Sequence, residues 1–298
     1  MRIAVLMSTY NGHRFLDKQL ESLANQTVVG NMTVYIRDDG SSDNTFDIID
    51  NWKKKLRIVL YKEENAGPAM SFWTLLMKPE IQADYYAFCD QDDIWDADKI
   101  EKGMEHLKGN IQLYACNCRI IDENGRVIKR YRIKGAPNMD IQKLFVSGCT
   151  QGCSMIFSDA LCQYIRKINI SCVPMHDLIL MLYAKCEGSI YWDEEPHFGY
   201  RVHSNNVVAK NNKTGIQKLK TTFWNWKNSS KNSMAAVAQE LIPYANKWKK
   251  VDIDYLMDMS NYKKSIISKW KVLMFGKMSS VDKKELRSYR IRILLNLL

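Results

Sequence analysis

The sequence contains no run of 18 apolar residues, so no membrane-spanning helix is predicted. Residues 1–10 are apolar, but they lack the long apolar region and the small-residue cleavage site of a signal peptide, and we interpret them as a first buried strand. Internal repeats and low-complexity tracts are absent as well. The 298 residues have the composition of a soluble globular protein, with room for one large α/β domain plus an appendage or for two domains.

Zinc-binding pairs of cysteines are also missing, because no two cysteines have the Cys-x-x-Cys spacing. Several cysteines lie in apolar, strand-like segments, where a free thiol behaves as a small core residue. A reduced, cytosolic compartment is the simplest account of this pattern. The eight cysteines are Cys89, Cys116, Cys118, Cys149, Cys153, Cys162, Cys172 and Cys186.

Glycine-rich phosphate loops are absent too. The first predicted strand ends in Ser-Thr-Tyr-Asn-Gly at 8–12, where a dinucleotide-binding fold needs several glycines next to the pyrophosphate. Only Gly12 is present, which argues against NAD or FAD, and no Walker A sequence occurs. The same loop has no lysine, which disfavours a nucleotidyltransferase.

The positive charge of the chain is concentrated in its C-terminal third. The whole chain has a net charge of +10, whereas residues 207–298 hold 19 Lys+Arg against 6 Asp+Glu, a net of +13. The other 206 residues hold 24 basic against 27 acidic side chains, a net of −3. This asymmetry indicates an acidic partner surface, either nucleic acid or anionic lipid.

Apolar runs and helical patterns predict an α/β core followed by a helical extension. The first part has the order βαβαβαβ, which implies a mostly parallel, right-handed wound sheet. A hairpin-like turn joins two strands in the middle, and the pattern becomes helical from about residue 214, with one apolar face over 255–274. Strands are predicted at 2–8, 32–37, 57–61, 84–89, 111–121, 126–131, 149–157 and 189–193, and helices at 14–25, 43–53, 69–77 and 176–185.

Residues 88–95, Phe-Cys-Asp-Gln-Asp-Asp-Ile-Trp, contain three carboxylates within four positions: Asp90, Asp92 and Asp93. They follow a buried strand, and open α/β sheets bind ligands at the carboxyl ends of their strands. Like charges packed there are unfavourable unless a cation neutralises them. Hard oxygen ligands suit Mg²⁺ or Mn²⁺, which usually also hold substrate phosphates. The alternative is a solvated acidic loop that caps the next helix.

Asp38 and Asp39 end the second strand at the same predicted edge. A carboxylate in this position can accept hydrogen bonds from a ribose or from a base N–H. The alternative is an Asx-type turn followed by a helix N-cap at Ser41, Ser42 or Asp43. One aspartate suffices for such a turn, so two in a row favour a binding function.

These motifs together resemble the family 2 nucleotide-sugar glycosyltransferases with the GT-A fold. The resemblance rests on the motif at 8–12, Arg-Asp-Asp-Gly-Ser-Ser-Asp-Asn-Thr at 37–45, Asn-Ala-Gly at 65–67 and Asp-Gln-Asp-Asp at 90–93. Cys-Asp-Gln-Asp-Asp-Ile-Trp at 89–95 and Tyr-Arg-Val-His-Ser-Asn-Asn-Val-Val at 200–208 are similar to the bacterial rhamnosyltransferase branch.

The resemblance covers residues 1–208 and implies a GT-A catalytic domain there, a Rossmann-like, mostly parallel sheet flanked by helices. Its nucleotide-sugar half is expected at 1–108 and its acceptor side at 109–208. Residues 209–298 carry none of the motifs and are predicted to be a basic helical C-terminal extension.

Roles for individual residues follow from the resemblance. Asp92 is the best candidate for direct ligation of Mn²⁺ or Mg²⁺, with Asp90 nearer the ribose and a second candidate ligand. His203 matches a late histidine that completes the metal or diphosphate site, and a hydrogen-bonded surface histidine is the alternative. The implied nucleotide-binding residues are Thr9, Tyr10, Asn11, Asp38, Asp39, Asn65, Gly67 and Asp90.

Asp177 is the implied catalytic base of an inverting transfer. The acceptor hydroxyl is a weak nucleophile, so a carboxylate must take its proton, while a divalent cation stabilises the charge on the leaving diphosphate. The family more often shows Glu-Asp or Asp-Asp where this chain has His-Asp, a form similar to the rhamnosyltransferase branch. A helix-start acid favoured by the dipole is the alternative. Acceptor contacts are expected from Gln151, Gly152, His176 and Trp95, although Trp95 is equally compatible with the core.

The resemblance suggests dTDP-L-rhamnose as donor, with UDP-glucose, UDP-galactose or a UDP-N-acetylhexosamine as the alternative, in the synthesis of a bacterial capsule or cell-wall polysaccharide. A lipid-linked saccharide acceptor would make membrane docking useful. Tryptophans interspersed with lysines favour peripheral contact with the inner face of the plasma membrane. A homodimerising bundle and a plain solvated face are the alternatives. The tryptophans are Trp224, Trp226, Trp248 and Trp270.

A nucleic-acid-binding protein is the rival from another class, because the basic tail carries these tryptophans. The sequence shows no recognisable nucleic-acid module, and the acidic sheet edge would repel phosphates without a metal. We therefore expect a nucleotide-sugar partner and no nucleic acid.

Overall fold

The computed structural model describes residues 1–109, 111–203, 233–274 and 282–298, and its contacts divide the chain into two compact units. The predicted boundary between catalytic domain and extension at residue 208 stays a prediction. Unit 1 comprises Met1–Pro137, Thr150–Asn169 and Glu187–Ala209, and unit 2 comprises Asn138–Cys149, Ile170–Cys186 and Lys210–Leu298.

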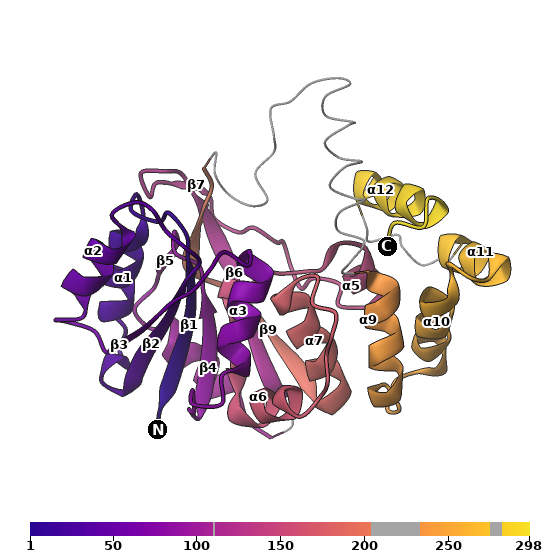
Figure 1. Cartoon of the computed structure of the whole chain (residues 1–298), viewed down its shortest axis with the longest axis horizontal. Coiled ribbons are helices and arrows are strands. Elements are labelled where there is room, and N and C mark those ends of the chain that lie inside the picture. Colours follow the sequence, from indigo (N-terminus) through magenta and orange to yellow (C-terminus); the bar gives the residue numbers. More distant parts are fainter. Residues whose placement is uncertain (110, 204–232, 275–281) are drawn as a thin grey trace. The chain divides into compact units, whose positions relative to one another are not determined.

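A mixed sheet forms the centre of unit 1 (Figure 1). Of the nine strands in the described residues, eight follow the order β3-β2-β1-β4-β8-β6-β9-β5, and the ninth, β7, pairs with β6. The strands are β1 (Ile3–Thr9), β2 (Met32–Asp38), β3 (Ile58–Lys62), β4 (Tyr85–Cys89), β5 (Ile94–Trp95), β6 (Ile111–Ile121), β7 (Val127–Lys129), β8 (Met155–Ser158) and β9 (Ser189–Arg201). The helices of unit 1 are α1 (Leu16–Ala24), α2 (Thr45–Trp52), α3 (Pro68–Met77), α4 (Lys99–His106) and α6 (Asp159–Arg166).

The βαβαβαβ order predicted for the first part is confirmed, and β3, β2, β1 and β4 are parallel neighbours. The central strands are buried on both faces, since residues 3–7 and 86–89 are at most 2% exposed. Each large apolar side chain buried in this way stabilises the fold by about 1.5–3 kcal/mol. In the register of the sheet Thr9 pairs with Asp38 and Met7 with Cys89, so the polar residues that follow these strands meet at one edge.

The second half of the sheet departs from the prediction at two places. The predicted strand at 149–157 begins only at Met155, because Gly152–Ser154 form a 3₁₀ turn. The strand predicted at 189–193 continues to Arg201, although the polar stretch 193–196 breaks its apolar pattern. Register shifts against β6 around Asn117 accommodate that stretch. The predicted hairpin of β6 and β7 is confirmed.

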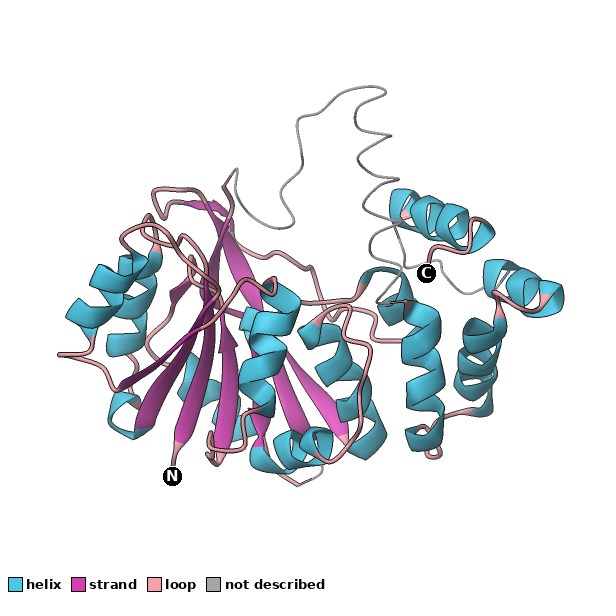
Figure 2. Ribbon diagram, viewed as in Figure 1, coloured by secondary structure: helices cyan, strands magenta, loops and turns pink. Residues whose placement is uncertain are grey.

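The described part of unit 2 is helical (Figure 2), and none of the helices in the residues searched is long and apolar enough to cross a membrane. The single helical face predicted over 255–274 is wrong, because α10 ends at Asn261 and α11 begins at Ile266. Ser265 starts the new helix as its N-cap, accepting a hydrogen bond from Ser268 N at 3.2 Å. The helices are α5 (Ile141–Ser147), α7 (His176–Glu187), α9 (Met234–Leu241), α10 (Lys250–Asn261), α11 (Ile266–Met274) and α12 (Lys283–Leu294).

Candidate active site

Hydrogen bonds tie the ends of β1 and β2 together. Thr9 Oγ1 donates to Asp38 Oδ2 at 2.8 Å, and Asp38 also accepts from Ser41 N at 2.7 Å and from Ser41 Oγ at 2.6 Å. Asn11 lies in the left-handed region with φ +47°, and its Oδ1 accepts from Ser42 N at 2.9 Å. The turn that follows the second strand is therefore built on Asp38, which fixes the loop that carries the predicted residues Thr9 and Asn11.

Asp39 holds a third loop in place at the same edge. It is 3% exposed, and its two carboxylate oxygens accept from Ala66 N and Gly67 N, each at 2.9 Å. An ion pair with Arg37 completes its environment. Gly67 has φ +79°, which favours glycine, and the predicted residue Asn65 is exposed on this loop. Both aspartates thus organise loops around the edge, and their direct contact with a nucleoside stays a prediction.

Gln91 joins the acidic turn to the loop after β1, a role that the sequence reasoning did not find. Its Oε1 accepts from Tyr10 N at 3.0 Å, and its Nε2 donates to Tyr10 O at 3.1 Å. A Cβ at Gly12 would collide with the Gln91 side chain, which explains the glycine at that position. The sequence did offer one indication of this role. Gln91 is the middle residue of an Asp-x-Asp element, and a glutamine amide can donate and accept hydrogen bonds at once.

The two best candidate ligands, Asp92 and His203, lie in direct contact although they are 111 residues apart. His203 Nε2 and Asp92 Oδ2 are 2.7 Å apart, and their side chains are 7% and 16% exposed. The Phe15 ring lies against the imidazole, with the ring centroids 4.7 Å apart. Arg201 Nε donates to Asp92 O at 2.7 Å and so holds the acidic turn. This geometry suits a metal site, and a hydrogen-bonded histidine accounts for the same contact.

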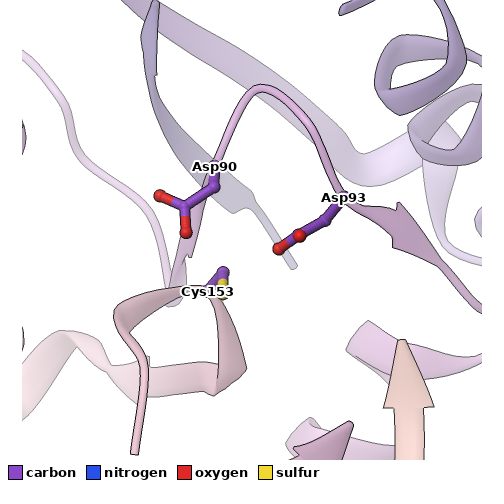
Figure 3. Close-up of side chains that lie close together, drawn as sticks. All are labelled: Asp90, Asp93 and Cys153. Atoms are coloured by element: carbon purple, nitrogen blue, oxygen red, sulfur yellow. The ribbon is translucent and has the colours of Figure 1, made fainter. Parts of the chain in front are cut away.

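A second group of possible ligands lies next to this pair. The ligand atoms of Asp90, Asp93 and Cys153 are all within 4.8 Å of one another, and the carboxylates point toward the thiol (Figure 3). Asp93 is fully buried, and its Oδ1 accepts from Arg201 N at 3.1 Å. Within the described part of the chain its Oδ2 has no hydrogen-bond partner. Burial, with Asp92 and Asp90 nearby, raises the pKa of Asp93 well above its usual range.

The donor set fits a divalent cation. Carboxylate oxygens and one imidazole suit Mn²⁺ or Mg²⁺, and the buried carboxylate of Asp93, close to Asp90 and Cys153, could supply a further ligand. Three neighbouring carboxylates are also the arrangement in which a bound cation relieves the most repulsion. Cys153 was not singled out from the sequence, because nothing in its surroundings marks it as different from the other buried cysteines.

Trp95 and Lys99 lie in the core beside the acidic turn. Trp95 is 3% exposed, and the Lys99 Nζ lies 3.5 Å from the centroid of its ring, within the range of a cation–π interaction. Lys99 is fully buried, and burial lowers its pKa. This burial is compatible with Trp95 as a core residue, and contact of Trp95 with the acceptor stays a prediction.

The predicted acceptor residues Gln151 and Gly152 lie directly before Cys153. Gly152 is buried, whereas Gln151 is half-buried, and its Nε2 approaches Cys118 Sγ at 3.6 Å. Thr150 Oγ1 and Ser154 Oγ are 2.9 Å apart across the same turn. This stretch thus belongs to the same unit as the acidic turn, and contact with an acceptor stays a prediction.

The predicted base Asp177 and its neighbour His176 begin α7 in unit 2. Asp177 Oδ1 accepts from Leu178 N at 2.7 Å, which is compatible with an acid at a helix start. His176 is 5% exposed, and burial lowers its pKa, while the nearby Asp177 opposes this shift. The catalytic role of Asp177 stays a prediction, as does acceptor contact by His176.

A sheet of this topology with carboxylates at the ends of its parallel strands defines the GT-A class of nucleotide-sugar transferases. The sequence profile described as "Glycosyl transferase family 2" matches residues 4–164, more than half of the chain. This chain therefore belongs to glycosyl transferase family 2, and it is a glycosyltransferase.

Named relatives agree with this membership. The dTDP-rhamnosyl transferase RfbG of Shigella flexneri is 28% identical over 218 residues, which are 69% of this chain and 74% of that protein. The Escherichia coli protein WfgD, named UDP-Glc:alpha-D-GlcNAc-diphosphoundecaprenol beta-1,3-glucosyltransferase, is 30% identical over 159 residues, or 53% of this chain and 60% of that protein.

Solved structures share the fold. TarS 1–349 of S. aureus in complex with UDP-GlcNAc has a TM-score of 0.63 at 14% identity, and the match covers all of this chain and 82% of that one. The mannosyltransferase PcManGT of Pyrobaculum calidifontis, in complex with GDP-Man and Mn²⁺, has a TM-score of 0.52 at 15% identity and is covered to 81%.

Proposed function

We propose that this enzyme is an inverting, metal-dependent hexosyltransferase that moves L-rhamnose from dTDP-L-rhamnose to a saccharide acceptor in bacterial surface polysaccharide synthesis. Two observations from the acidic turn carry the proposal: the contact between Asp92 and His203, and the group formed by Asp90, Asp93 and Cys153. The ends of β1 and β2 pair at the same sheet edge. A sheet edge built in this way provides for a nucleoside and for a diphosphate–metal complex at once.

The donor is proposed from the relatives. RfbG, which carries the name dTDP-rhamnosyl transferase, shares 28% identity over two thirds of this chain. A UDP-hexose is the second candidate, because WfgD is named for UDP-Glc and TarS was solved with UDP-GlcNAc. Few residues in a sugar pocket decide between such donors, so the two candidates must be separated by experiment.

The residues of the acidic turn would hold Mn²⁺ or Mg²⁺. When bound, such an ion neutralises the negative charge that develops on the leaving nucleoside diphosphate. Asp92 and His203 face each other and are proposed as the first pair of ligands, and Asp90 is proposed to lie nearer the ribose. Gln91 and Asp39 keep those loops in position through backbone hydrogen bonds, so that the nucleoside and the diphosphate bind to a preformed edge.

Asp177 is proposed as the base. Its carboxylate would accept the proton of the acceptor hydroxyl as that oxygen attacks the anomeric carbon, and the bond to the diphosphate oxygen would break on the opposite face. Attack from the face opposite to the leaving group inverts the anomeric centre. Gln151, Gly152 and His176 are proposed to contact the acceptor.

We also propose that the enzyme works in the cytoplasm, attached peripherally to the inner face of the plasma membrane where a lipid-linked acceptor is presented. The net charge of +13 over residues 207–298 supports this location. Trp270 is 59% exposed and available for such contact, whereas Trp248 Nε1 donates to Lys185 O at 3.0 Å within unit 2. Trp224 and Trp226 lie outside the described residues, and a homodimer remains the alternative use of the helices.

The test is hydrolysis of the donor, with water taking the place of the acceptor, measured by phosphorus NMR with dTDP-L-rhamnose and UDP-glucose, each with Mn²⁺ or with a chelator. We expect release of dTDP only with metal, reduced at least about 100-fold in Asp92→Ala, since a metal ion contributes several kcal/mol to such a step. Asp50→Ala, which removes an exposed carboxylate of α2, is the matched control and keeps full activity. Equal release with chelator, or full activity of Asp92→Ala, would contradict the metal role.

A further inference from the structure

One helix of unit 2 exposes an apolar face. Four side chains of α11 are large, apolar and mostly exposed, and we call them the α11 face: Ile266 at 76%, Ile267 at 70%, Trp270 at 59% and Met274 at 69%. At 3.6 residues per turn they fall within an arc of about 100°. Val272 and Leu273, at most 7% exposed, anchor α11 in its unit. On the helical wheel Leu273 lies about 20° from Ile266, so the exposed apolar arc adjoins the side by which α11 packs in its unit.

This face is not the ordinary scatter of exposed apolar residues. Single exposed apolar side chains are normal on soluble proteins, whereas a contiguous apolar patch marks an interaction site. In the described residues 16 large apolar side chains are at least 38% exposed, and eight of them lie from Val251 to Leu295. Four of those eight share this one nine-residue helix.

A lysine borders the α11 face on one side. On the helical wheel Lys271 follows about 40° beyond Ile267, whereas Lys269 lies between the buried residues Leu273 and Val272. Lys271 is 63% exposed and its Nζ is 3.6 Å from Asp258 Oδ2, while Lys264 just before the helix is exposed too. An apolar stripe bordered by lysine side chains is the pattern of a helix that lies in a bilayer interface.

The charge of the surroundings decides between the two obvious occupants. The described residues 233–274 and 282–298 hold 12 Lys+Arg against 6 Asp+Glu, a net of +6, so two copies repel each other when their α11 faces meet. The same charge attracts anionic lipid headgroups by about 1 kcal/mol for each nearby Lys or Arg. The charge therefore favours a lipid surface over a second copy of the chain.

We propose that the α11 face is the docking surface for an anionic bilayer, with the helix lying in the plane of the interface and its apolar side chains among the acyl chains. Lys271 on the helix flank, with the exposed Lys264 just before the helix, extends toward the phosphates of the headgroups. This proposal names the surface that makes the membrane contact of the proposed function. It rests on the proposed function only in one respect, namely that docking brings the enzyme to a lipid-linked acceptor.

The experiment is co-sedimentation of the full chain with vesicles of phosphatidylglycerol and phosphatidylethanolamine, and with vesicles of phosphatidylcholine alone. We expect binding to the anionic vesicles that is at least tenfold tighter and weakens with salt. The double variant Ile266→Ser/Trp270→Ser should lose at least tenfold in affinity. Val127→Ser/Ile128→Ser on β7, where the side chains are 56% and 61% exposed, is the matched control and should bind like the wild type.

Three outcomes would overturn the proposal: equal binding to both vesicle types, wild-type binding by the α11 variant, or a dimer in sedimentation velocity that the α11 variant abolishes. Because α11 exposes these side chains, the variant should keep its melting temperature, which is measured alongside. Cleavage of a soluble donor by the same variant should be unchanged. If the wild type does not cleave the donor at all, the proposed transferase function is rejected. Failure of the membrane proposal and failure of the proposed function are therefore distinguishable.

Discussion

Gln91→Ala offers a sharp test of how the nucleotide site is assembled. The substitution removes the two hydrogen bonds between the Gln91 amide and the backbone N–H and C=O of Tyr10, at 3.0 and 3.1 Å. A hydrogen bond of this kind contributes about 0.5–1.5 kcal/mol, so the pair is worth about 1–3 kcal/mol. Without these bonds the loop after β1 becomes ordered only when the nucleotide binds, and the free energy of ordering it is subtracted from the free energy of binding. This predicts a loss of about 5- to 150-fold in nucleotide affinity.

Calorimetric titration of dTDP or UDP in the presence of Mn²⁺ measures this loss. Gln82→Ala is the matched control, because Gln82 is an exposed glutamine just before β4 and its substitution removes an amide of the same size. We expect the control to bind like the wild type, and the melting temperature of both variants to stay within a few degrees. A Gln91→Ala protein that binds nucleotide within twofold of the wild type would refute the idea that this amide preorganises the site.

Three further predictions address the base, the metal and the fold. Asp177→Asn should keep nucleotide binding but lower transfer by about 100- to 10,000-fold, as loss of a general base does, and normal transfer would reject the assignment. His203→Ala should weaken Mn²⁺ binding at least about tenfold in calorimetry, whereas unchanged affinity would leave only the hydrogen-bonded alternative. In β9, burial raises the pKa of Asp193, but hydrogen bonds from His197, Glu195 N and Tyr114 outweigh this and lower it to about 2. The ionised Asp193 therefore contributes its full stabilisation above about pH 4, and this contribution is lost as the pH falls toward 2. We expect Asp193→Asn to lower the free energy of unfolding, measured with urea, by about 2 kcal/mol at pH 6 and by less at pH 3. If the variant were destabilised by the same amount at pH 3 as at pH 6, the lowered pKa of Asp193 would not be a source of stability.

The parallel half of the sheet was predictable because its strands are continuous apolar runs that end in polar residues. Residues 3–7 and 86–89 show this pattern and are buried on both faces. The same logic placed Asp38 and Asp90 at one edge, since parallel strands bring their carboxyl ends together. The local pattern of apolar and polar residues was therefore sufficient to predict the strands whose structure depends on residues close in sequence.

The errors lie where distant contacts override the local pattern. The end of β9 is a strand because it pairs with β6 over residues 117–121 and with β5, although its own residues are polar around Asp193. The helix predicted over 255–274 is broken at Tyr262, whose buried hydroxyl donates to Leu298 O at 2.6 Å. Neither contact is visible in a window of ten or twenty residues.

The site shows the same division. Asp92 and His203 were paired through the family resemblance, and the structure brings them to 2.7 Å. Arg201 at the end of β9 donates to Asp92 O and to Asp93 Oδ1, and it was missed because both partners lie more than a hundred residues away in the sequence. Cys153 was missed for the same reason, since only the folded chain places it next to Asp90.

The most direct test of the central claim is a thermal-shift panel of dTDP, UDP and GDP, each with Mn²⁺, Mg²⁺ or a chelator. A ligand that binds only the native state raises the melting temperature by mass action, with about 2.7 kcal/mol of added stability at a hundredfold excess over its Kd. We predict a clear shift with dTDP in the presence of Mn²⁺, a smaller one with UDP and none with chelator. A panel in which no nucleotide shifts the melting temperature, or in which metal makes no difference, would contradict a metal-dependent nucleotide-sugar site.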